Sequence, residues 1–269
     1  MRSLLAPSVY NSPEVFAREQ ERIFRRLWIF AGPRTLLTEP DSFITRTIGG
    51  VPIVIQNFAG ELKAFVNRCA HRQSAIQIAE HGRRRLACPY HGWVYDGDGK
   101  VASIPFCDSL YGFDDRVRTS RHLDGVALEC VGSMMFVNLD ADPMPLESQF
   151  HREFLDRIAY VSSYFDDEVL VANFGGGFNW KLIFENVLDS NHVPFVHSGS
   201  FAKLLPKRRP DPVQSAARNA RTPPDSGLTT DLRDMSFTAE TSIEFRHWPW
   251  HDNVERFSNE AKYFNYFIY

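Results

Sequence analysis

Two short motifs in the first half of the chain combine cysteine with histidine, residue types that bind transition metals. Cys69 and His71 form a Cys-x-His motif, and Cys88 and His91 form a Cys-x-x-His motif after an interval of 16 residues. Thiolate and imidazole groups bind zinc and iron–sulfur clusters alike. The four residues therefore predict a metal centre, and two facing loops would have to bring them together.

Two kinds of centre fit these four residues. A single zinc ion needs all four ligands around one point, whereas a Rieske-type [2Fe–2S] cluster takes two sulfurs on one iron and two imidazoles on the other. The order of Cys and His suits the cluster, because each loop then supplies one ligand to each iron. Pro89, Tyr90, Gly92 and Trp93 closely flank His91, so strands on either side could hold the two loops as a clamp.

A second group of possible ligands lies in the segment NWKLIFENVLDSNHVPFVH, residues 179–197. On a helix, Glu185, Asp189 and His192 would form one polar line on an otherwise apolar segment. Pro194 would break or end that helix, which lets the backbone swing His197 back towards the line. Two histidines and a carboxylate with open positions make the facial triad of a non-haem Fe(II) site. The alternative is a buried polar cluster that caps a helix.

The elements around the first motifs read as a helix followed by short strands. Ser12-Pro13-Glu14 is a helix-start signal, and the apolar spacing predicts a helix up to about Trp28. Alternating strand-like runs separated by glycine turns then predict a compact antiparallel β domain over residues 40–145. The expected strands are Phe43–Ile48, Val51–Asn57, Glu61–Asn67, Arg84–Ala87, Trp93–Tyr95, Lys100–Ile104 and Ser133–Leu139.

The second half mixes helix and strand, so the expected fold class is α+β. Helical texture covers Leu146–Ser162 and begins again at Asn179, with strands expected at Glu168–Phe174 and Met235–Phe245. Residues 206–230 are polar and rich in proline, which predicts a flexible loop. The expected divisions are residues 1–39, a helical segment that packs on the second domain; residues 40–145, the β domain; and residues 146–269, part of a second domain.

Composition limits the classes of partner. The 269 residues carry a net charge of −3, and no run approaches the ~20 apolar residues that span a bilayer. We therefore expect neither a nucleic-acid nor a membrane surface. Four cysteines do not make a disulfide scaffold, so a reducing cytoplasmic location is expected. Cys107 and Cys130 are expected to be buried as small apolar residues.

The motif CPYHGW after Cys-x-His resembles the Rieske domain of the Rieske non-haem iron oxygenases. The resemblance implies that Cys69 and Cys88 bind one iron of a [2Fe–2S] cluster and that His71 and His91 bind the other. It disfavours zinc. His81 lies between the two motifs, matches no ligand position and is expected at the surface.

The segment Asn-Trp-Lys, Glu-Asn and Asp-x-x-His-x-x-x-x-His resembles the second motif of the same family, in the large (α) subunit. The resemblance assigns His192 and His197 to a mononuclear non-haem Fe(II). It assigns Asp189 to a bridge that links His192 to His91 of a neighbouring subunit. It also implies a catalytic domain of the helix-grip, START-like type with an antiparallel sheet.

One part of the family pattern has no counterpart. The family's third iron ligand is an aspartate far beyond the second histidine, and the sequence ends 72 residues after His197. Asp231, Asp234, Glu244 and Asp252 follow His197, but none lies at the expected place, and we expect them to be surface charges. The expectation is an α subunit that lacks its C-terminal part and is inactive alone; a short natural variant is the alternative.

The resemblance implies a terminal oxygenase. It would take electrons from a ferredoxin or flavin reductase, ultimately from NAD(P)H, and use O2 to hydroxylate or dihydroxylate a small organic, most simply aromatic, substrate. A homotrimer, or an α3β3 assembly with a small subunit, follows from the bridge between subunits. The alternative function is a Rieske-type electron-transfer module without oxygenation chemistry of its own.

Overall fold

The computed structural model describes residues 6–166, 168–169, 176–188 and 192–199. The chain divides into two units, residues 1–177 and 178–269, which are described separately. Within the described residues, no helix is both long enough and apolar enough to cross a membrane.

The first unit begins with the expected helix. α1 (Ser8–Asn11) is followed by α2 (Pro13–Glu19) and by one π-helical turn, η1 (Gln20–Phe24). The Ser12 hydroxyl accepts a hydrogen bond from the Val15 N–H at 3.3 Å, and Pro13 occupies the first helical position. This helix start confirms the signal read from the sequence.

Within the described residues nine strands follow, and seven of them form one antiparallel sheet in the order β1-β9-β8-β4-β3-β2-β5. The other two, β6 and β7, pair in a separate hairpin. The first strand, residues 29–33, lies before the β domain expected at residues 40–145, so the sheet extends beyond the expected boundary. The strands are β1 (Ile29–Pro33), β2 (Ser42–Ile48), β3 (Val51–Phe58), β4 (Glu61–Val66), β5 (His81–Arg83), β6 (Val94–Tyr95), β7 (Val101–Ser103), β8 (Gly125–Val131) and β9 (Met134–Asn138).

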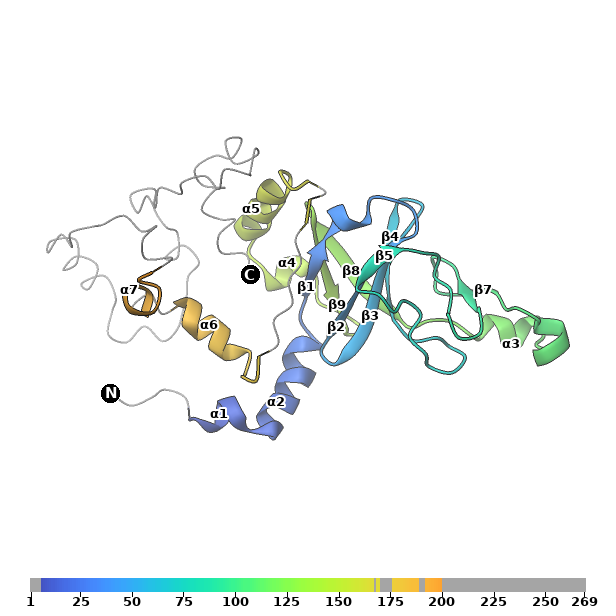
Figure 1. The fold of residues 1–269 in the computed structure, drawn as a ribbon, viewed down its shortest axis with the longest axis horizontal. Coiled ribbons are helices and arrows are strands. Elements are labelled where there is room, and N and C mark those ends of the chain that lie inside the picture. Colours follow the sequence, from blue (N-terminus) through green and yellow to red (C-terminus); the bar gives the residue numbers. More distant parts are fainter. Residues whose placement is uncertain (1–5, 167, 170–175, 189–191, 200–269) are drawn as a thin grey trace, which may run out of the picture. The chain divides into compact units, whose positions relative to one another are not determined.

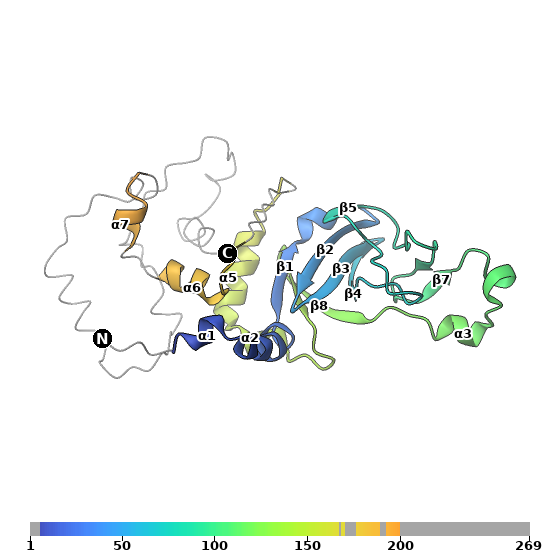
Figure 2. The same cartoon turned by 60° about the horizontal axis from the view of Figure 1, so that its bottom comes forward.

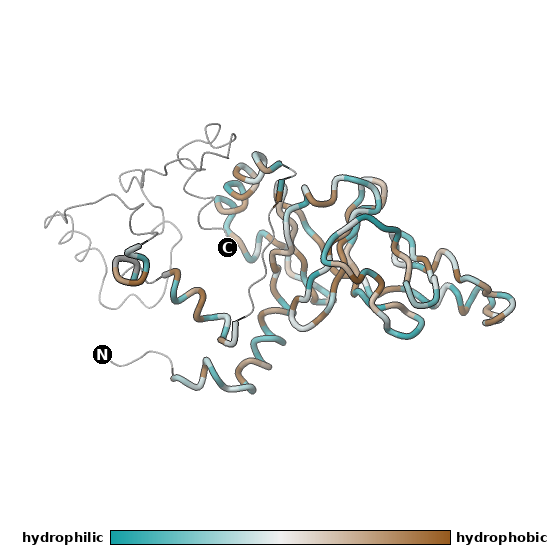
Figure 3. Tube along the Cα trace, in the orientation of Figure 1, coloured by the Kyte–Doolittle hydropathy of each residue, from teal (hydrophilic) through white to brown (hydrophobic). Residues whose placement is uncertain are grey.

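Alternate residues of the central strands enter two different cores. On β3, Val54 packs with the loops that carry the cysteine motifs, whereas Ile53 and Ile55 pack on the opposite face with residues of β1 and β9. Side chains alternate between the faces of a strand, so both faces of this sheet are covered. In Figure 3 the hydrophobic segments accordingly follow the central strands.

Short helical elements complete the first unit. They are η2 (Arg34–Leu37), the π-helical turn η3 (Cys107–Tyr111), α3 (Asp115–Thr119), α4 (Leu146–Gln149) and α5 (Arg152–Ser162). Figures 1 and 2 both show β7 and α3 at one end of the sheet, with α2 and α5 towards the other. Val101 of β7 packs against the core that contains Cys69 and Cys88.

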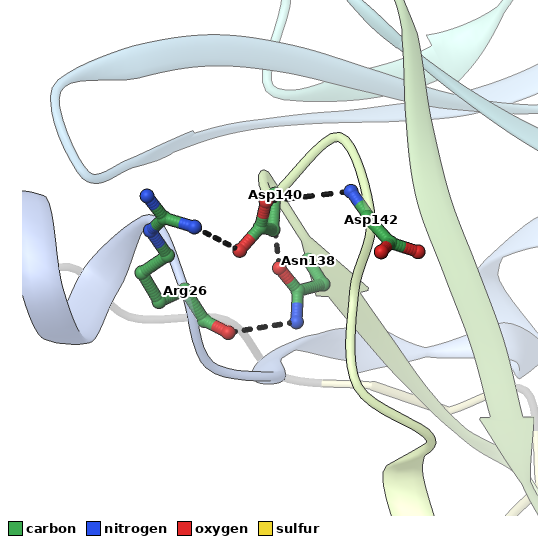
Figure 4. Close-up of polar contacts among 4 residues, drawn as sticks. All are labelled: Arg26, Asn138, Asp140 and Asp142. Atoms are coloured by element: carbon green, nitrogen blue, oxygen red, sulfur yellow. Dashed lines mark hydrogen bonds and ion pairs between the residues drawn. The ribbon is translucent and has the colours of Figure 1, made fainter.

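A polar network ties the helical segment to the end of β9. The Arg26 guanidinium lies 2.7 Å from the Asp140 carboxylate, and the Asn138 side chain donates to the Arg26 carbonyl at 3.0 Å. The Asn138 side-chain oxygen also accepts from the Asp140 N–H (Figure 4). Residues more than 100 positions apart in the sequence are thereby joined.

Several expectations about the elements were wrong in detail. The strand expected at Arg84–Ala87 lies earlier, at β5, because His81–Arg83 pair with β2, and Ala87 contributes only an isolated bridge to Val94. Leu146–Ser162 is two helices, α4 and α5, rather than one. Strand β8 had not been predicted.

The expectation for the two remaining cysteines was also wrong. Cys107 is half-buried and Cys130 is exposed. Cys107 lies in η3, and Cys130 lies near the end of β8, where the strand has an exposed side.

The second unit contributes α6 (Lys181–Leu188) and α7 (Val193–Val196). The Asn179 side chain accepts from the Lys181 N–H at 3.1 Å, directly before α6. The expected loop at 206–230 and the expected strand at Met235–Phe245 lie outside the described residues. Most of the strand expected at Glu168–Phe174 and the sheet expected for a helix-grip domain also lie outside them.

Candidate functional site

The first motif lies in a loop closed by a buried asparagine. Asn67 follows β4, and its side-chain oxygen accepts from the Ile76 and Gln77 N–H groups, both at 3.0 Å. Its amide donates to the Gln77 carbonyl at 2.7 Å. A buried amide with all these bonds made is a rigid clasp, so Cys69 and His71 project from a loop of fixed shape.

The second motif lies in a tight turn between Ala87 and Val94. The Cys88 N–H donates to the Trp93 carbonyl at 2.8 Å, and the Gly92 N–H donates to the Cys88 carbonyl at 2.9 Å. Gly92 has φ +71°, and a Cβ there would lie 2.9 Å from Cγ of Pro105. Glycine is therefore required beside His91 on both conformational and steric grounds.

The two loops bring the four predicted ligands together as a pair of thiols and a pair of imidazoles. Cys69 and Cys88 are 1% and 2% exposed. The His71 and His91 rings lie 4.6 Å apart between centroids. Within the described residues, no group of three or more His, Cys, Asp or Glu side chains is arranged so that it could hold a single metal ion.

The surroundings of these side chains fit a cluster with thiolate and imidazole ligands. Burial raises the pKa of the Cys69 thiol, and the neighbouring Cys88 thiol raises it further, while hydrogen bonds from Tyr95 and the His71 N–H lower it. Nδ1 of His71 is buried and has no hydrogen-bond partner among the described residues. A buried nitrogen without a partner is costly, and a metal ion would satisfy it.

An aromatic shell fixes the orientation of the imidazoles. The Trp93 ring stacks on the His71 ring at 4.8 Å with an interplanar angle of 3°, and Tyr111 meets His71 edge-on at 5.5 Å. Tyr111 ends the π-helical turn η3, which begins after Phe106 in a left-handed conformation, φ +57°. The strained backbone of this turn thus holds an aromatic ring against a predicted ligand.

A tyrosine not singled out by the sequence reading contacts the first cysteine. The Tyr95 hydroxyl lies 3.0 Å from Sγ of Cys69 and accepts a 3.0 Å hydrogen bond from the Ala70 N–H. Burial and the Cys69 sulfur raise the pKa of Tyr95 well above its usual range. A thiolate can only accept a hydrogen bond, so the protonated hydroxyl is its donor.

Three further histidines were considered in the sequence analysis. His81 is exposed on β5, as expected for a residue outside the ligand set. In the second unit, the His192 and His197 rings lie 5.2 Å apart with an interplanar angle of 67°, a separation that lets two imidazoles bind one ion. Pro194 does not break a helix between them, because it lies in the first turn of α7, where proline is tolerated.

Of the carboxylates of the second site, Glu185 is exposed on α6. Asp189 lies outside the described residues, as do Asp231, Asp234, Glu244 and Asp252.

Comparisons with known families match both halves of the chain. A family model of the Rieske [2Fe-2S] domain matches residues 28–119. A second model, the ring hydroxylating alpha subunit (catalytic domain), matches residues 155–267. The first half is thus a Rieske domain, whose cofactor is a [2Fe–2S] cluster, and the second belongs to a class of domain that carries a mononuclear iron.

Individual proteins similar to this chain are also oxygenase subunits. The chain is 34% identical over 246 residues to the glycine betaine monooxygenase oxygenase subunit of Chromohalobacter salexigens, covering 90% of this chain and 51% of the relative. It is 32% identical over 195 residues to the carnitine monooxygenase oxygenase subunit of Acinetobacter pittii, covering 71% and 51%. Among solved structures, a quaternary ammonium Rieske monooxygenase in complex with L-carnitine superposes with a TM-score of 0.64 at 30% identity, covering 73% and 55%.

The chain belongs to the large (α) subunits of the Rieske oxygenases. It spans about half the length of these curated relatives. The expected α+β class, with an antiparallel Rieske domain first, is confirmed.

Proposed function

We propose that the chain acts in a terminal oxygenase, which uses O2 and electrons from a separate donor to oxygenate a small organic molecule. The observation that carries the proposal is the pairing of two buried thiols with two adjacent imidazoles from opposed loops. When bound, the cluster supplies one-electron transfer and the mononuclear iron supplies the oxygen chemistry.

Each predicted ligand has a proposed role. Cys69 and Cys88 hold one iron of the cluster, and His71 and His91 hold the other. The thiols lie in the sheet-facing core and the imidazoles further out, since His71 and His91 are both half-buried. This difference in burial shields the sulfur ligands from water and leaves the imidazoles near the surface.

His192 and His197 are proposed to bind the mononuclear iron. The support is the closeness of their two rings. Asp189 is proposed as a positioning residue between His192 and His91 of a neighbouring subunit, since a carboxylate on the outer nitrogen of a metal-bound imidazole orients that ring.

The partners are proposed from the family. An electron donor, a ferredoxin or a flavin reductase supplied by NAD(P)H, would meet the imidazole side of the cluster. A bridge between subunits requires an oligomer, for which a homotrimer or an α3β3 assembly is proposed. The free cysteines fit a reducing compartment such as the cytoplasm. The proposed divisions of the chain are residues 1–39, 40–145 and 146–269, with β1 of the first segment completing the sheet of the second.

The substrate is proposed only as a class. The sequence resemblance favoured an aromatic compound, and the anthranilate 1,2-dioxygenase large subunit of Acinetobacter baylyi is one relative, 31% identical. The carnitine and glycine betaine enzymes point to quaternary ammonium compounds. Both classes belong in the first substrate panel.

The metal content tests this function against its alternatives. An oxygenase should hold roughly three irons for every two acid-labile sulfides, whereas an electron-transfer module should hold roughly two for two. The full reading frame that contains this chain should be purified without oxygen and analysed for iron, sulfide and zinc. A colourless protein with one zinc and no sulfide would overturn the proposal.

A further inference from the structure

A buried glutamine joins three parts of the Rieske domain. Gln77 ends the first ligand loop, residues 67–77, and is 1% exposed. Its side-chain nitrogen donates to the Gln56 side-chain oxygen and to the Arg84 carbonyl, both at 3.0 Å. Gln56 lies on β3, and Arg84 begins the second ligand loop, residues 84–93. One side chain thus bonds to both the sheet and the second ligand loop.

The Arg84 guanidinium strengthens this junction. Its Nε and Nη2 groups donate to the Gln77 side-chain oxygen at 2.9 and 2.8 Å, and Nη2 also donates to the Ile76 carbonyl. Hydrogen bonds from a charged donor are stronger than neutral ones. The Arg84 backbone is fixed in turn, because its N–H donates to the Asp41 carbonyl at 2.9 Å and its carbonyl accepts from the Gln56 side chain at 3.1 Å. The end of the first ligand loop is therefore tied to the start of the second.

Residues beside this junction pack with the cysteine ligands. Ile76 directly precedes Gln77, Leu86 lies in the second ligand loop, and the two are 0% and 1% exposed. Both belong to the same core as Cys69 and Cys88. Protein interiors are close-packed, so a shift of one side chain is transmitted to its neighbours. A change in the spacing of the two loops would therefore move the two sulfurs relative to each other.

The proposed ligand set makes that spacing important. Each loop supplies one sulfur and one nitrogen, and each iron of the cluster takes one ligand from each loop. If the loops moved apart, both irons would lose part of their coordination at once. The Asn67 side chain fixes the shape of the first loop through the Ile76 and Gln77 backbone. The Gln77 side chain joins the base of that loop to the second loop.

We propose that Gln77 is a positioning residue that holds the two ligand loops at the separation required by the [2Fe–2S] cluster, before iron is bound. This inference rests on the proposed roles of the two cysteines and two histidines as cluster ligands. Gln77 acts through the backbones of the loops. A buried polar network whose members are all bonded rigidifies a core, and ligands that are already arranged lose less freedom when they bind.

The first test compares thiol burial in the iron-free protein. Protein from the full reading frame that contains this chain is freed of iron with a chelator, kept reduced and treated with iodoacetamide. Peptide mass spectrometry follows the alkylation of each cysteine. In the parent, Cys69 and Cys88 should react slowly because they are 1% and 2% exposed, whereas the exposed Cys130 is an internal standard for the reagent. In Gln77→Met both ligand thiols should react about tenfold faster relative to Cys130, because the loops separate more often.

The matched control for the loss of a buried amide is Asn57→Leu. Asn57 is 3% exposed on the same strand, β3, but its side chain bonds to the Leu37 carbonyl at 2.7 Å and to the Gly60 N–H at 2.6 Å, outside both ligand loops. Asn57→Leu should lower the urea midpoint about as much as Gln77→Met does. It should leave the relative alkylation rates of the two ligand thiols within about twofold of the parent.

The cluster-loaded protein gives a second readout. Loss of the brown colour to an iron chelator should be about tenfold faster in Gln77→Met than in the parent. The electron paramagnetic resonance signal of the reduced cluster should also broaden, because loosely held loops give a spread of iron environments. Asn57→Leu should keep the parental signal and the parental rate of colour loss.

A second pair of variants tests the junction from the surface. Arg84→Met removes the guanidinium bonds to Gln77 and Ile76 on an exposed residue, and should speed thiol alkylation and colour loss by about threefold. Arg83→Met is its matched control. Arg83 is also exposed and donates to a backbone carbonyl, that of Pro40 at 2.9 Å, but not to either ligand loop. Arg83→Met should behave like the parent.

Two results would overturn the positioning inference alone. One is a brown Gln77→Met protein whose ligand thiols, relative to Cys130, react no faster than those of Asn57→Leu. The other is equal rates of alkylation and colour loss in Arg84→Met and Arg83→Met, a comparison that decides the matter if Gln77→Met does not fold. A colourless parent protein without acid-labile sulfide would instead overturn the proposed function, and this inference with it.

Discussion

The Tyr95 hydroxyl lies 3.0 Å from Sγ of Cys69, and it is also the acceptor for the Ala70 N–H. Both contacts join strand β6 to the first ligand loop. The hydroxyl therefore has one available proton, directed at a sulfur that carries negative charge when it binds iron. Hydrogen bonds to cluster sulfurs set the reduction potential of iron–sulfur proteins.

Replacing this hydroxyl should lower the cluster potential. In Tyr95→Phe the added electron loses a stabilising hydrogen bond, and a difference of about 1 kcal/mol between the two redox states corresponds to roughly 40 mV for one electron. Spectroelectrochemistry of the visible bands measures the shift. Tyr111→Phe is the control, because Tyr111 packs on His71 but makes no hydroxyl hydrogen bond among the described residues. Equal potentials for Tyr95→Phe and Tyr111→Phe would contradict the prediction.

The link between Arg26 and Asp140 should stabilise the fold in a pH-dependent way. The hydrogen bond from Arg26 is the main cause that lowers the pKa of Asp140. Because the folded-state pKa is the lower one, the stabilisation is present above the unfolded pKa, about 3.9, and is lost as the pH falls through the folded value.

Asp140→Asn should therefore lower the urea midpoint at pH 7, and its difference from the parent should shrink as the pH falls below the unfolded pKa and through the lowered folded pKa of Asp140. Asp142→Asn makes the same charge change two residues away, where no ion pair occurs among the described residues, and should leave the midpoint near the parental value (Figure 4). A difference for Asp140→Asn that persists unchanged in acid would show that the charge is not its cause.

The sequence predicted the elements whose signal is local. β2, β3 and β4 are short strand-like runs separated by the turns at Gly49-Gly50 and Ala59-Gly60, and their bounds agree with the expected ones to within one residue. β8 was missed because its sequence, GVALECV, is exposed or half-buried along its length and shows no clean alternation. The π-helical turn η3 depends on Phe106 adopting a left-handed conformation, which propensity disfavours.

The ligand set was easier to predict than its surroundings. Spacing alone identified Cys69, His71, Cys88 and His91 as candidate metal ligands, because the ligands of one metal centre must converge. The Tyr95–Cys69 contact depends instead on how the β6 strand lies against the first loop, a tertiary relation with no local signal. The exposure of Cys130 has the same origin, since only the sheet order shows which side of β8 is uncovered.

Gly132 should be among the least replaceable glycines of the first unit. It lies in the turn between β8 and β9 with φ +58°, and a Cβ there would lie 2.2 Å from Oγ of Ser162 and 2.8 Å from Cα of Ala159. Ser162 Oγ also accepts from the Ser133 N–H at 2.9 Å. Gly132→Ala should therefore push α5 away from the sheet and lower the free energy of unfolding by about 3 kcal/mol.

Gly50→Ala separates the two causes of that loss. Gly50 has φ +74°, but a Cβ there would meet nothing within 4 Å. It should lose only the backbone contribution, about 1 kcal/mol. Urea unfolding of both variants measures the difference, and similar losses in the two would mean that the contact with α5 adjusts freely.

The decisive variant for the cluster is His91→Ala, paired with His81→Ala. Both remove one imidazole from the same domain, but only His91 lies against His71, at 4.6 Å, whereas His81 is exposed on β5. Loss of a nitrogen ligand leaves one iron incompletely bound, so His91→Ala should lose the electron paramagnetic resonance signal of the reduced two-imidazole [2Fe–2S] centre. His81→Ala should keep the signal, the brown colour and the parental iron content. The Asn67 clasp and the sheet do not involve His91, so far-ultraviolet circular dichroism of His91→Ala should remain that of a folded domain. A parental signal in His91→Ala, or its loss in His81→Ala, would mean that the second imidazole ligand has been assigned to the wrong histidine.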